Sequence, residues 1–325
     1  MKKLLVSGLV ALVAAFSAHA AEAYKIAVIP KGTTHEFWKS IHAGAVKAQR
    51  ELQAQGIAVN VIWKGPLKED DREQQIQVVE NFIGQQVNAI VLAPLDKRGL
   101  VAPVETAVRG KIPVVIVDSA LESKLPVSFV ATDNKEGGRI AARNLGKLLG
   151  GTGNIIMLRY QVGSASTEER EAGFLEVMKN DFPNIRLLSS DPHAGATRDS
   201  AKRVAENLLN RFGRQVNGIF ASNESAASGM LLALRDAGLN GKVKFVAFDA
   251  GETLNAGLKA GDVAGFVIQN PMQMGYLGVK TAVAALRGEK VQAVIDTGVG
   301  FVTKENMNDP AIADIMNPPL DKYLN

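Results

Sequence analysis

Hydrophobic and polar positions follow two alternating patterns along this chain. From Tyr24 onward, short runs of apolar, often β-branched residues alternate with longer segments whose apolar positions recur with a helical period. The short runs are apolar almost without interruption, which is typical of strands covered on both faces. Strands that alternate with amphipathic helices in this way predict βαβ units and a parallel sheet.

The pattern predicts where these elements lie. Strands are expected at 24–30, 58–63, 89–94, 113–118, 128–133, 154–159, 185–191, 218–222, 243–249 and 263–269, with helices between them, for example at 36–55, 70–85, 135–149 and 224–237. No helix-length segment separates the strands at 113–118 and 128–133, so we expect a crossing between two domains near 131–133. Two domains also suit a chain of about 300 residues, which exceeds what one core usually organises.

Polar residues follow the predicted strands. They are Lys31, His35, Asp118, Arg170, Asn223, Asp249 and Gln269. Any single Asp or Asn here could be a helix cap, but Arg170 and Gln269 are poor caps, and open α/β sheets bind ligands at the carboxyl ends of strands. Charged and amide groups match the hydroxyls of a carbohydrate, and Phe37 and Trp38 would supply an aromatic surface unless they pack in the core.

The first residues predict an export signal over 1–23. Lys2 and Lys3 precede an apolar run at 4–16, and Ala18-His19-Ala20 resembles a cleavage site, placing cleavage near Ala20 to Ala23. The run is short for a membrane anchor, the alternative interpretation. Since the chain has no cysteine, disulfides and a lipid-attachment site are excluded, so we expect a protein free in the periplasm and not lipid-anchored.

Other classes of protein find less support. The net charge is +4, without the basic cluster that a nucleic-acid partner requires. His35, His42 and His193 lack metal-ligand spacing, and Ser164-Ala165-Ser166 indicates a helix start better than a nucleophile. We therefore expect no catalytic residue, cofactor or metal. The effector core of a sugar-responsive repressor is a further alternative, disfavoured by the export signal.

Several motifs together resemble a known family. They are Ile29-Pro30-Lys31, His35-Glu36-Phe37-Trp38, Val117-Asp118, the segment 169–174 around Arg170, Phe220-Ala221-Ser222-Asn223, Val246-Ala247-Phe248-Asp249 and Gln269. Along essentially the whole mature chain, the sequence resembles the periplasmic binding proteins of the ribose and galactose type. The resemblance implies two similar doubly wound α/β domains with parallel sheets, joined by a three-crossing hinge. The lobes would comprise 24–131 plus 270–297 and 132–269 plus 298–325.

The resemblance also implies a function. Arg170, Asn223, Asp249 and Gln269 would hold ligand hydroxyls in the cleft, and a monomer closing on its ligand would deliver it to the permease of an ABC transporter. Delivery to a chemoreceptor is compatible with this function. Three positions depart from the ribose protein. Ser119 replaces an arginine, Ala196 replaces the aromatic residue of the second domain, and Lys31 resembles the autoinducer-2 binding relatives. We therefore predict a neutral monosaccharide or sugar alcohol; a sugar acid or an autoinducer-2-like ligand is the alternative.

Overall fold

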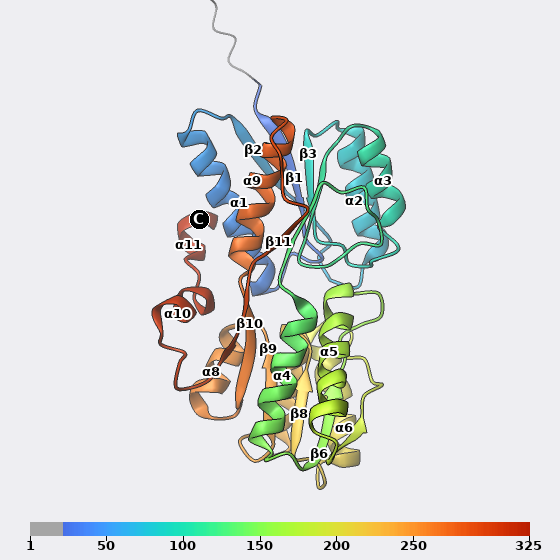
Figure 1. Ribbon diagram of the computed structural model, residues 1–325, viewed down its shortest axis with the longest axis vertical. Helices are drawn as coiled ribbons and strands as arrows, with labels where there is room; N and C mark the ends of the chain where they lie inside the picture. The colour runs from blue at the N-terminus through green and yellow to red at the C-terminus, as the bar shows by residue number, and fades with distance from the viewer. Residues whose placement is uncertain (1–21) are drawn as a thin grey trace, which may run out of the picture.

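The structure, a computed structural model, describes residues 22–325. The export signal is predicted over 1–23. Residues 1–21 lie outside the described part, so only Glu22 and Ala23 of this segment are described. Within residues 22–325, no helix has both the length and the apolar character needed to cross a membrane. The described chain forms two lobes, one above the other in Figure 1.

The first lobe is built on a six-stranded sheet with the order β11-β5-β4-β3-β1-β2. Its strands are β1 (Tyr24–Ile29), β2 (Val59–Trp63), β3 (Ala89–Leu92), β4 (Val114–Val117), β5 (Ser128–Ala131) and β11 (Val294–Asp296), all parallel. Helices α1 (Glu36–Ala54) and α9 (Pro271–Leu286) cover one face, and α2 (Arg72–Gly84) and α3 (Val101–Arg109) cover the other. Alternate residues of β1 enter the two cores, which explains its uninterrupted apolar sequence.

The second lobe has a six-stranded sheet with the order β12-β10-β9-β8-β6-β7. Its strands are β6 (Gly153–Leu158), β7 (Ile185–Ser189), β8 (Gly218–Ala221), β9 (Lys244–Phe248), β10 (Gly265–Gln269) and β12 (Val299–Val302). Helices α4 (Asn134–Leu148) and α5 (Ala165–Asp181) cover one face; α6 (Arg198–Phe212), α7 (Glu224–Asp236) and α8 (Glu252–Ala260) cover the other. The prediction of two similar parallel α/β halves is confirmed, except that β12 runs antiparallel to β10.

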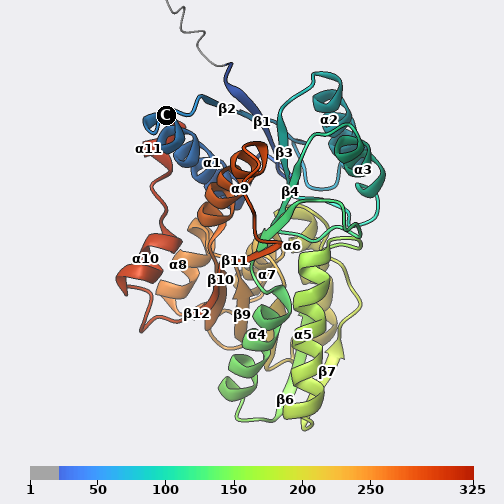
Figure 2. The same cartoon turned by 45° about the horizontal axis from the view of Figure 1, so that its top comes forward.

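The chain passes between the sheets three times. The passages run from β5 to α4, from β10 to α9 and from β11 to β12. Two of them are joined directly, because the Thr132 hydroxyl donates to the carbonyl oxygen of Gly298 at 3.0 Å. All three lie side by side at the boundary of the lobes, as Figure 2 shows.

The C-terminal tail differs from the expected division of the chain. Residues 298–325 were assigned to the second lobe, and α10 (Pro310–Met316) does contact β10 there. The last helix, α11 (Leu320–Leu324), instead packs on α1 of the first lobe, where Arg50 donates to the carbonyl oxygens of Lys322 at 2.6 Å and Tyr323 at 3.3 Å. The tail therefore spans both lobes.

Two glycines let α4 and α5 approach each other closely. A Cβ atom on Gly138 would lie 1.9 Å from the carbonyl oxygen of Arg170, and one on Gly173 would lie 2.1 Å from that of Lys135. Both distances are far below van der Waals contact. The absence of two side chains thus fixes the position of α5, which carries Arg170.

We expect Gly138→Ala to lower the free energy of unfolding by about 1 to 3 kcal/mol, the usual range for overpacking, since the contacted atoms are backbone. Urea unfolding would measure the change. Gly84→Ala is the control: this glycine is the last residue of α2, has open space around it, and should gain about 0.5 to 1 kcal/mol. Equal stability of Gly138→Ala and the wild type would contradict the close approach.

Candidate functional site

A cavity of about 30 Å³ lies between the lobes, where the carboxyl ends of the two sheets face each other. Its lining residues are Lys31, His35, Phe37, Trp38, Glu69, Asp118, Tyr160, Ser166, Thr167, Arg170, Asn223, Glu224, Asp249 and Gln269. The structure thus brings together every predicted site residue except Ser119. Ser119 lies just behind the lining and is fully buried, and its hydroxyl accepts a 3.1 Å hydrogen bond from the backbone N–H of Ser166 in the other lobe.

Asp118 and Asp249 occupy equivalent places in the two lobes. Each directly follows a strand, β4 or β9, and the two strands hold the same position in their sheets. Both residues have a positive φ, 63° for Asp118 and 72° for Asp249, a conformation that costs energy in residues other than glycine. Both residues line the cavity.

Lys31 joins the two lobes from the end of β1. Its Nζ atom lies 2.9 Å from Asp118 Oδ2 in its own lobe, and it donates to the hydroxyls of Ser164 at 3.3 Å and Ser166 at 3.2 Å in the other. The side chain is buried. The segment Ser164-Ala165-Ser166 does start a helix, α5, as the sequence predicts, and it also places these hydroxyls against Lys31.

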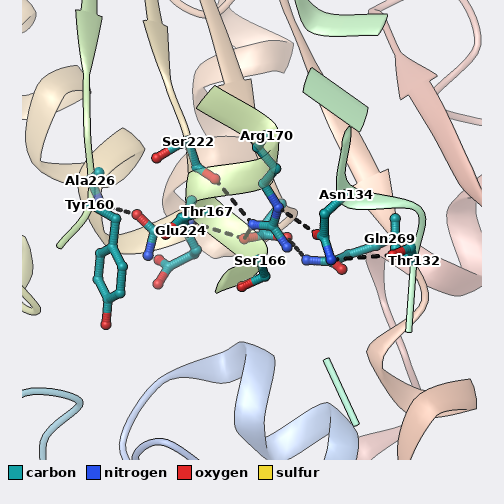
Figure 3. A network of polar contacts seen from close by, with 12 residues as sticks. Thr132, Asn134, Tyr160, Ser166, Thr167, Arg170, Ser222, Glu224, Ala226 and Gln269 are labelled. Carbon is teal, nitrogen blue, oxygen red and sulfur yellow. Dashed lines mark hydrogen bonds and ion pairs between the residues drawn. The ribbon is translucent and has the colours of Figure 1, made fainter. Parts of the chain in front are cut away.

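Arg170 reaches the site from inside a helix, which differs from the position expected at the end of a strand. It lies in α5 and is buried, with Nε donating to Asn134 Oδ1 at 2.9 Å and Nη1 donating to the Ser222 carbonyl at 3.1 Å (Figure 3). Its guanidinium lies 3.9 Å from the centre of the Phe248 ring and 3.8 Å from Asp249 Oδ2. These contacts hold the charge rigidly beside the cavity.

Asp249 has a carboxyl group whose pKa is raised by burial. Burial raises its pKa to about 6, against the lowering effects of the Arg170 charge and of the hydrogen bond donated by Gln269 Nε2 at 2.7 Å. Because this pKa exceeds the ordinary value of 3.8, the folded protein binds a proton at Asp249 more tightly than the unfolded chain does. Proton binding therefore stabilises the fold at low pH, and this stabilisation is lost as the pH rises through about 6.

We therefore expect the stability of the wild type, relative to that of Asp249→Asn, to fall by about 2 to 3 kcal/mol as the pH rises from 4 to 7.5, since a shift of one pKa unit corresponds to about 1.4 kcal/mol. The variant lacks the titrating carboxyl group, so it should not share this fall. Urea unfolding across this pH range would measure it. A stability difference independent of pH would show that Asp249 is not held ionised against its burial.

Glu69 is the centre of a network that crosses the cleft. Its carboxylate accepts hydrogen bonds from Trp38 Nε1 and His35 Nδ1 in its own lobe and from the Tyr160 hydroxyl in the other; His35 Nδ1 is 2.9 Å away. Burial lowers the pKa of His35, but the hydrogen bond and charge of Glu69 outweigh it, so the pKa lies above its ordinary value. Burial raises the pKa of Glu69, yet His35 brings it below the ordinary value. The pair therefore favours its charged form.

Five lining residues were missed by the sequence interpretation: Glu69, Tyr160, Ser166, Thr167 and Glu224. Two of them could have been predicted from their position after a strand. Tyr160 lies just beyond β6, and Glu224 follows Asn223 after β8. Ser166 and Thr167 lie in the first turn of α5. Glu69 lies in the long connection between β2 and α2, where sequence alone gives no direction for the side chain.

The aromatic residues partly follow expectation. Trp38 is buried in the core of the first lobe, as the alternative interpretation had it, and also lines the cavity with Phe37, which it meets edge to face at 5.0 Å between ring centres. Ala196, the aligned position of the second-domain aromatic, is buried outside the lining. Tyr160 supplies an aromatic ring from that lobe instead.

Asn223 combines both roles that its sequence position suggested. Its side-chain oxygen accepts the backbone N–H of Ala226 at 3.2 Å and so caps α7, while the residue also lines the cavity. Among residues 22–325, no group of three or more His, Asp or Glu side chains is arranged to hold a metal ion. The site offers hydrogen bonds and charge, with an aromatic wall.

The lobes are in contact across the cleft. Besides the bonds of Lys31 and Glu69, Lys97 Nζ lies 2.8 Å from Glu168 Oε2, and the Glu252 backbone N–H donates to Glu36 Oε2 at 2.9 Å. A cavity of about 30 Å³ is small beside the roughly 300 Å³ or more of ordinary ligand pockets, so a ligand of ordinary size enters only when the lobes separate or side chains move. Two α/β lobes on a three-passage hinge, closing on buried polar groups, define a solute-binding protein that clamps a small ligand.

Comparison with known proteins supports this class. Residues 26–290 match the family described as periplasmic binding protein domain. The chain is 32% identical to the ribose import binding protein of Escherichia coli, over 94% of this chain and 99% of that protein. It is 30% identical to a xylitol-binding protein of Mycolicibacterium smegmatis, covering 83% of this chain and 76% of the other.

Solved structures agree. A carbohydrate transporter solute-binding protein from Agrobacterium radiobacter, in complex with D-arabinose, superposes with a TM-score of 0.86 at 35% identity, covering 91% of this chain and all of that one. A solute-binding protein from Agrobacterium vitis with bound D-fucose gives 0.85 at 34% identity, with coverage of 90% and 100%. The chain belongs to the periplasmic binding protein family, among the sugar-binding solute-binding proteins of ABC transporters. The family is one of binding proteins.

Proposed function

We propose that this protein captures a neutral monosaccharide or sugar alcohol between its lobes and delivers it, without catalysis, to the permease of an ABC transporter. The relatives named for ribose and xylitol, and the structures holding D-arabinose and D-fucose, support a sugar or polyol ligand. Residues Lys31, His35, Phe37, Trp38, Asp118, Arg170, Asn223, Asp249 and Gln269 are the proposed ligand contacts, with Ser119 behind them.

The pairing of charges around the cavity is the main support for a neutral ligand. Each lining carboxylate has a cationic partner within 4 Å. The pairs are Asp118 with Lys31, Glu69 with His35, Asp249 with Arg170 and Glu224 with Arg198. Because the charges are already balanced, a carboxylate on the ligand would add uncompensated negative charge to a buried site, which is costly.

Lys31 bears directly on the sugar-acid alternative. An anionic ligand would need this cation, yet Asp118 and two serine hydroxyls from the other lobe already surround its Nζ atom. We therefore take Lys31 as a residue that closes the cleft and donates to a hydroxyl, rather than one that binds a ligand carboxylate.

The protein is also proposed to act in the periplasm and to interact there with membrane proteins. A relative named as a D-allose-binding periplasmic protein and the predicted export signal support a periplasmic location, and the lack of cysteine supports a protein without a lipid anchor. We propose that it is a monomer. In such proteins the permease distinguishes the closed form from the open one, and a ligand that binds the closed form more tightly shifts the population toward it. Recognition by a chemoreceptor is compatible with the same closed surface.

A thermal-shift screen of the chain from Ala21 onward tests the ligand class. Pentoses, hexoses, deoxysugars, alditols and sugar acids would be compared, because a ligand that binds only the folded state raises the melting temperature. We expect neutral sugars or alditols to stabilise the protein and aldonic and uronic acids to have no effect. Stabilisation by sugar acids alone would overturn the proposal of a neutral ligand.

A further inference from the structure

Glu224 lines the cavity, and one oxygen of its carboxylate has no hydrogen-bond partner among the described residues. It lies at the start of α7, in the second lobe, and its side chain is 3% exposed. Among the described residues, the Oε2 atom is buried and accepts no hydrogen bond. A buried acceptor left in this state costs free energy, so the site is completed when a donor reaches it.

The other atoms of Glu224 are firmly held. Oε1 accepts from Arg198 Nε at 3.1 Å and from the Ser228 hydroxyl at 3.0 Å, while the backbone N–H of Glu224 donates to Asp249 Oδ2 at 3.1 Å. The side chain therefore cannot turn Oε2 away without breaking these bonds. Figure 3 shows Glu224 and Tyr160 extending from the second lobe toward the first.

Within residues 22–325, no donor forms a hydrogen bond with this oxygen. His35 Nδ1 lies 3.9 Å from Oε2, beyond hydrogen-bond distance, and is already engaged with Glu69 at 2.9 Å. A carboxylate oxygen offers only acceptor capacity, so the missing partner must donate. A sugar hydroxyl has this property, whereas a ligand carboxylate does not.

We propose that Glu224 Oε2 accepts a hydrogen bond from one hydroxyl of the ligand and so determines which hydroxyl the ligand must carry. This inference rests on the proposed function and deepens it, since it names a specificity-determining residue. Gln269 repeats the arrangement: its Nε2 is bound to Asp249, and its Oε1 is buried without a partner among the described residues. The site therefore selects a ligand that donates at two places.

Isothermal titration calorimetry on the full mature chain tests the role of Glu224. The probe is the tightest binder among D-ribose, D-allose, D-arabinose, D-fucose and xylitol, together with its monodeoxy analogues. In the wild type, we expect one analogue to bind about 10- to 100-fold more weakly than the parent, the usual effect of losing a hydrogen bond to a charged group. Glu224→Gln should weaken the parent by a similar factor and no longer discriminate against that analogue.

Glu171→Gln is the matched control. Glu171 is an equally buried carboxylate of the same lobe, bonded to the Tyr160 backbone N–H at 3.1 Å and the Ser222 hydroxyl at 3.0 Å, and it does not line the cavity. Its replacement should lower the melting temperature but leave the discrimination against the deoxy analogue intact. Thermal unfolding of Glu224→Gln checks that this variant folds.

Two results would count against the inference in different ways. If Glu224→Gln folds, binds the parent within twofold of the wild type and still discriminates against the analogue, Glu224 is not a specificity residue. If the wild type itself binds no sugar or alditol, the proposed function fails before any variant is compared.

Discussion

Replacing Arg170 with methionine should lower the free energy of unfolding by about 3 to 5 kcal/mol, the range found when one partner of a buried ion pair is removed. Arg170 is 2% exposed, and it is the cation beside Asp249. Its loss also leaves Asn134 Oδ1 and the Ser222 carbonyl without their donor, and removes the charge above the Phe248 ring. Urea unfolding at pH 7.5 measures the change.

The double variant Arg170→Met with Asp249→Asn separates charge from packing. If the unpaired carboxylate is the main cost, the second substitution should restore most of the lost stability, because the buried charge is then absent. Ligand binding should be lost in the single and in the double variant, since both residues line the cavity. A loss below about 1 kcal/mol in the single variant would contradict a buried ion pair.

Lys31→Met is the second large effect, and it should appear in ligand binding. The Nζ atom of Lys31 bonds Ser164 and Ser166 of the opposite lobe, so its contacts exist only when the cleft is closed. Without the cation, closure would bury Asp118 unpaired, a cost of about 3 kcal/mol or more. Because the ligand holds the closed form, we expect an apparent affinity about 100-fold weaker, measured by calorimetry.

Lys97→Met provides the comparison. Lys97 also crosses the cleft, to Glu168, but its side chain is 28% exposed and that of Glu168 is 32% exposed. Ion pairs accessible to water contribute little, about 0 to 1 kcal/mol, so affinity should fall less than about fivefold. Similar losses in both variants would mean that burial of the Lys31 pair is not what stabilises closure.

Small-angle scattering should report the same difference as a change of shape. The Lys31→Met protein should have a larger radius of gyration than the wild type without ligand, because fewer bonds join its lobes. Addition of saturating ligand should bring the two values together. An identical profile for both ligand-free proteins would argue that other contacts, such as those of Glu69, suffice to keep the lobes together.

Much of the fold was predictable because its strands are buried on both faces. The run 89–94 is apolar throughout and 218–222 is apolar up to Ser222, and the structure places β3 and β8 within them. The polar residues that follow strands were predictable for the same reason: once the sheet is parallel, their carboxyl ends share one edge. Asp118, Asn223 and Asp249 were found in this way, and all three line the cavity.

What the sequence could not provide depends on contacts between distant segments. The Glu69 carboxylate accepts a hydrogen bond from the Tyr160 hydroxyl, which lies 91 positions away in the other lobe. No local pattern in the sequence indicates that pairing. Arg170 lies within α5, so its direction follows from how closely Gly138 and Gly173 let two helices pack. The tail was misplaced because α11 is short, and its sequence does not say which lobe it packs against.

Both ends of the described chain lie on the first lobe, since β1 begins there and α11 packs on α1 (Figure 1). A surface tether at either end therefore immobilises the first lobe and leaves the second free to swing. Fluorescent proteins fused to the two ends would both be attached at the first lobe, so the distance between them should change little on closure. An optical sugar sensor needs one dye on the second lobe. Leu148 is exposed there, and because the chain has no cysteine, Leu148→Cys would introduce a single thiol for attaching the dye.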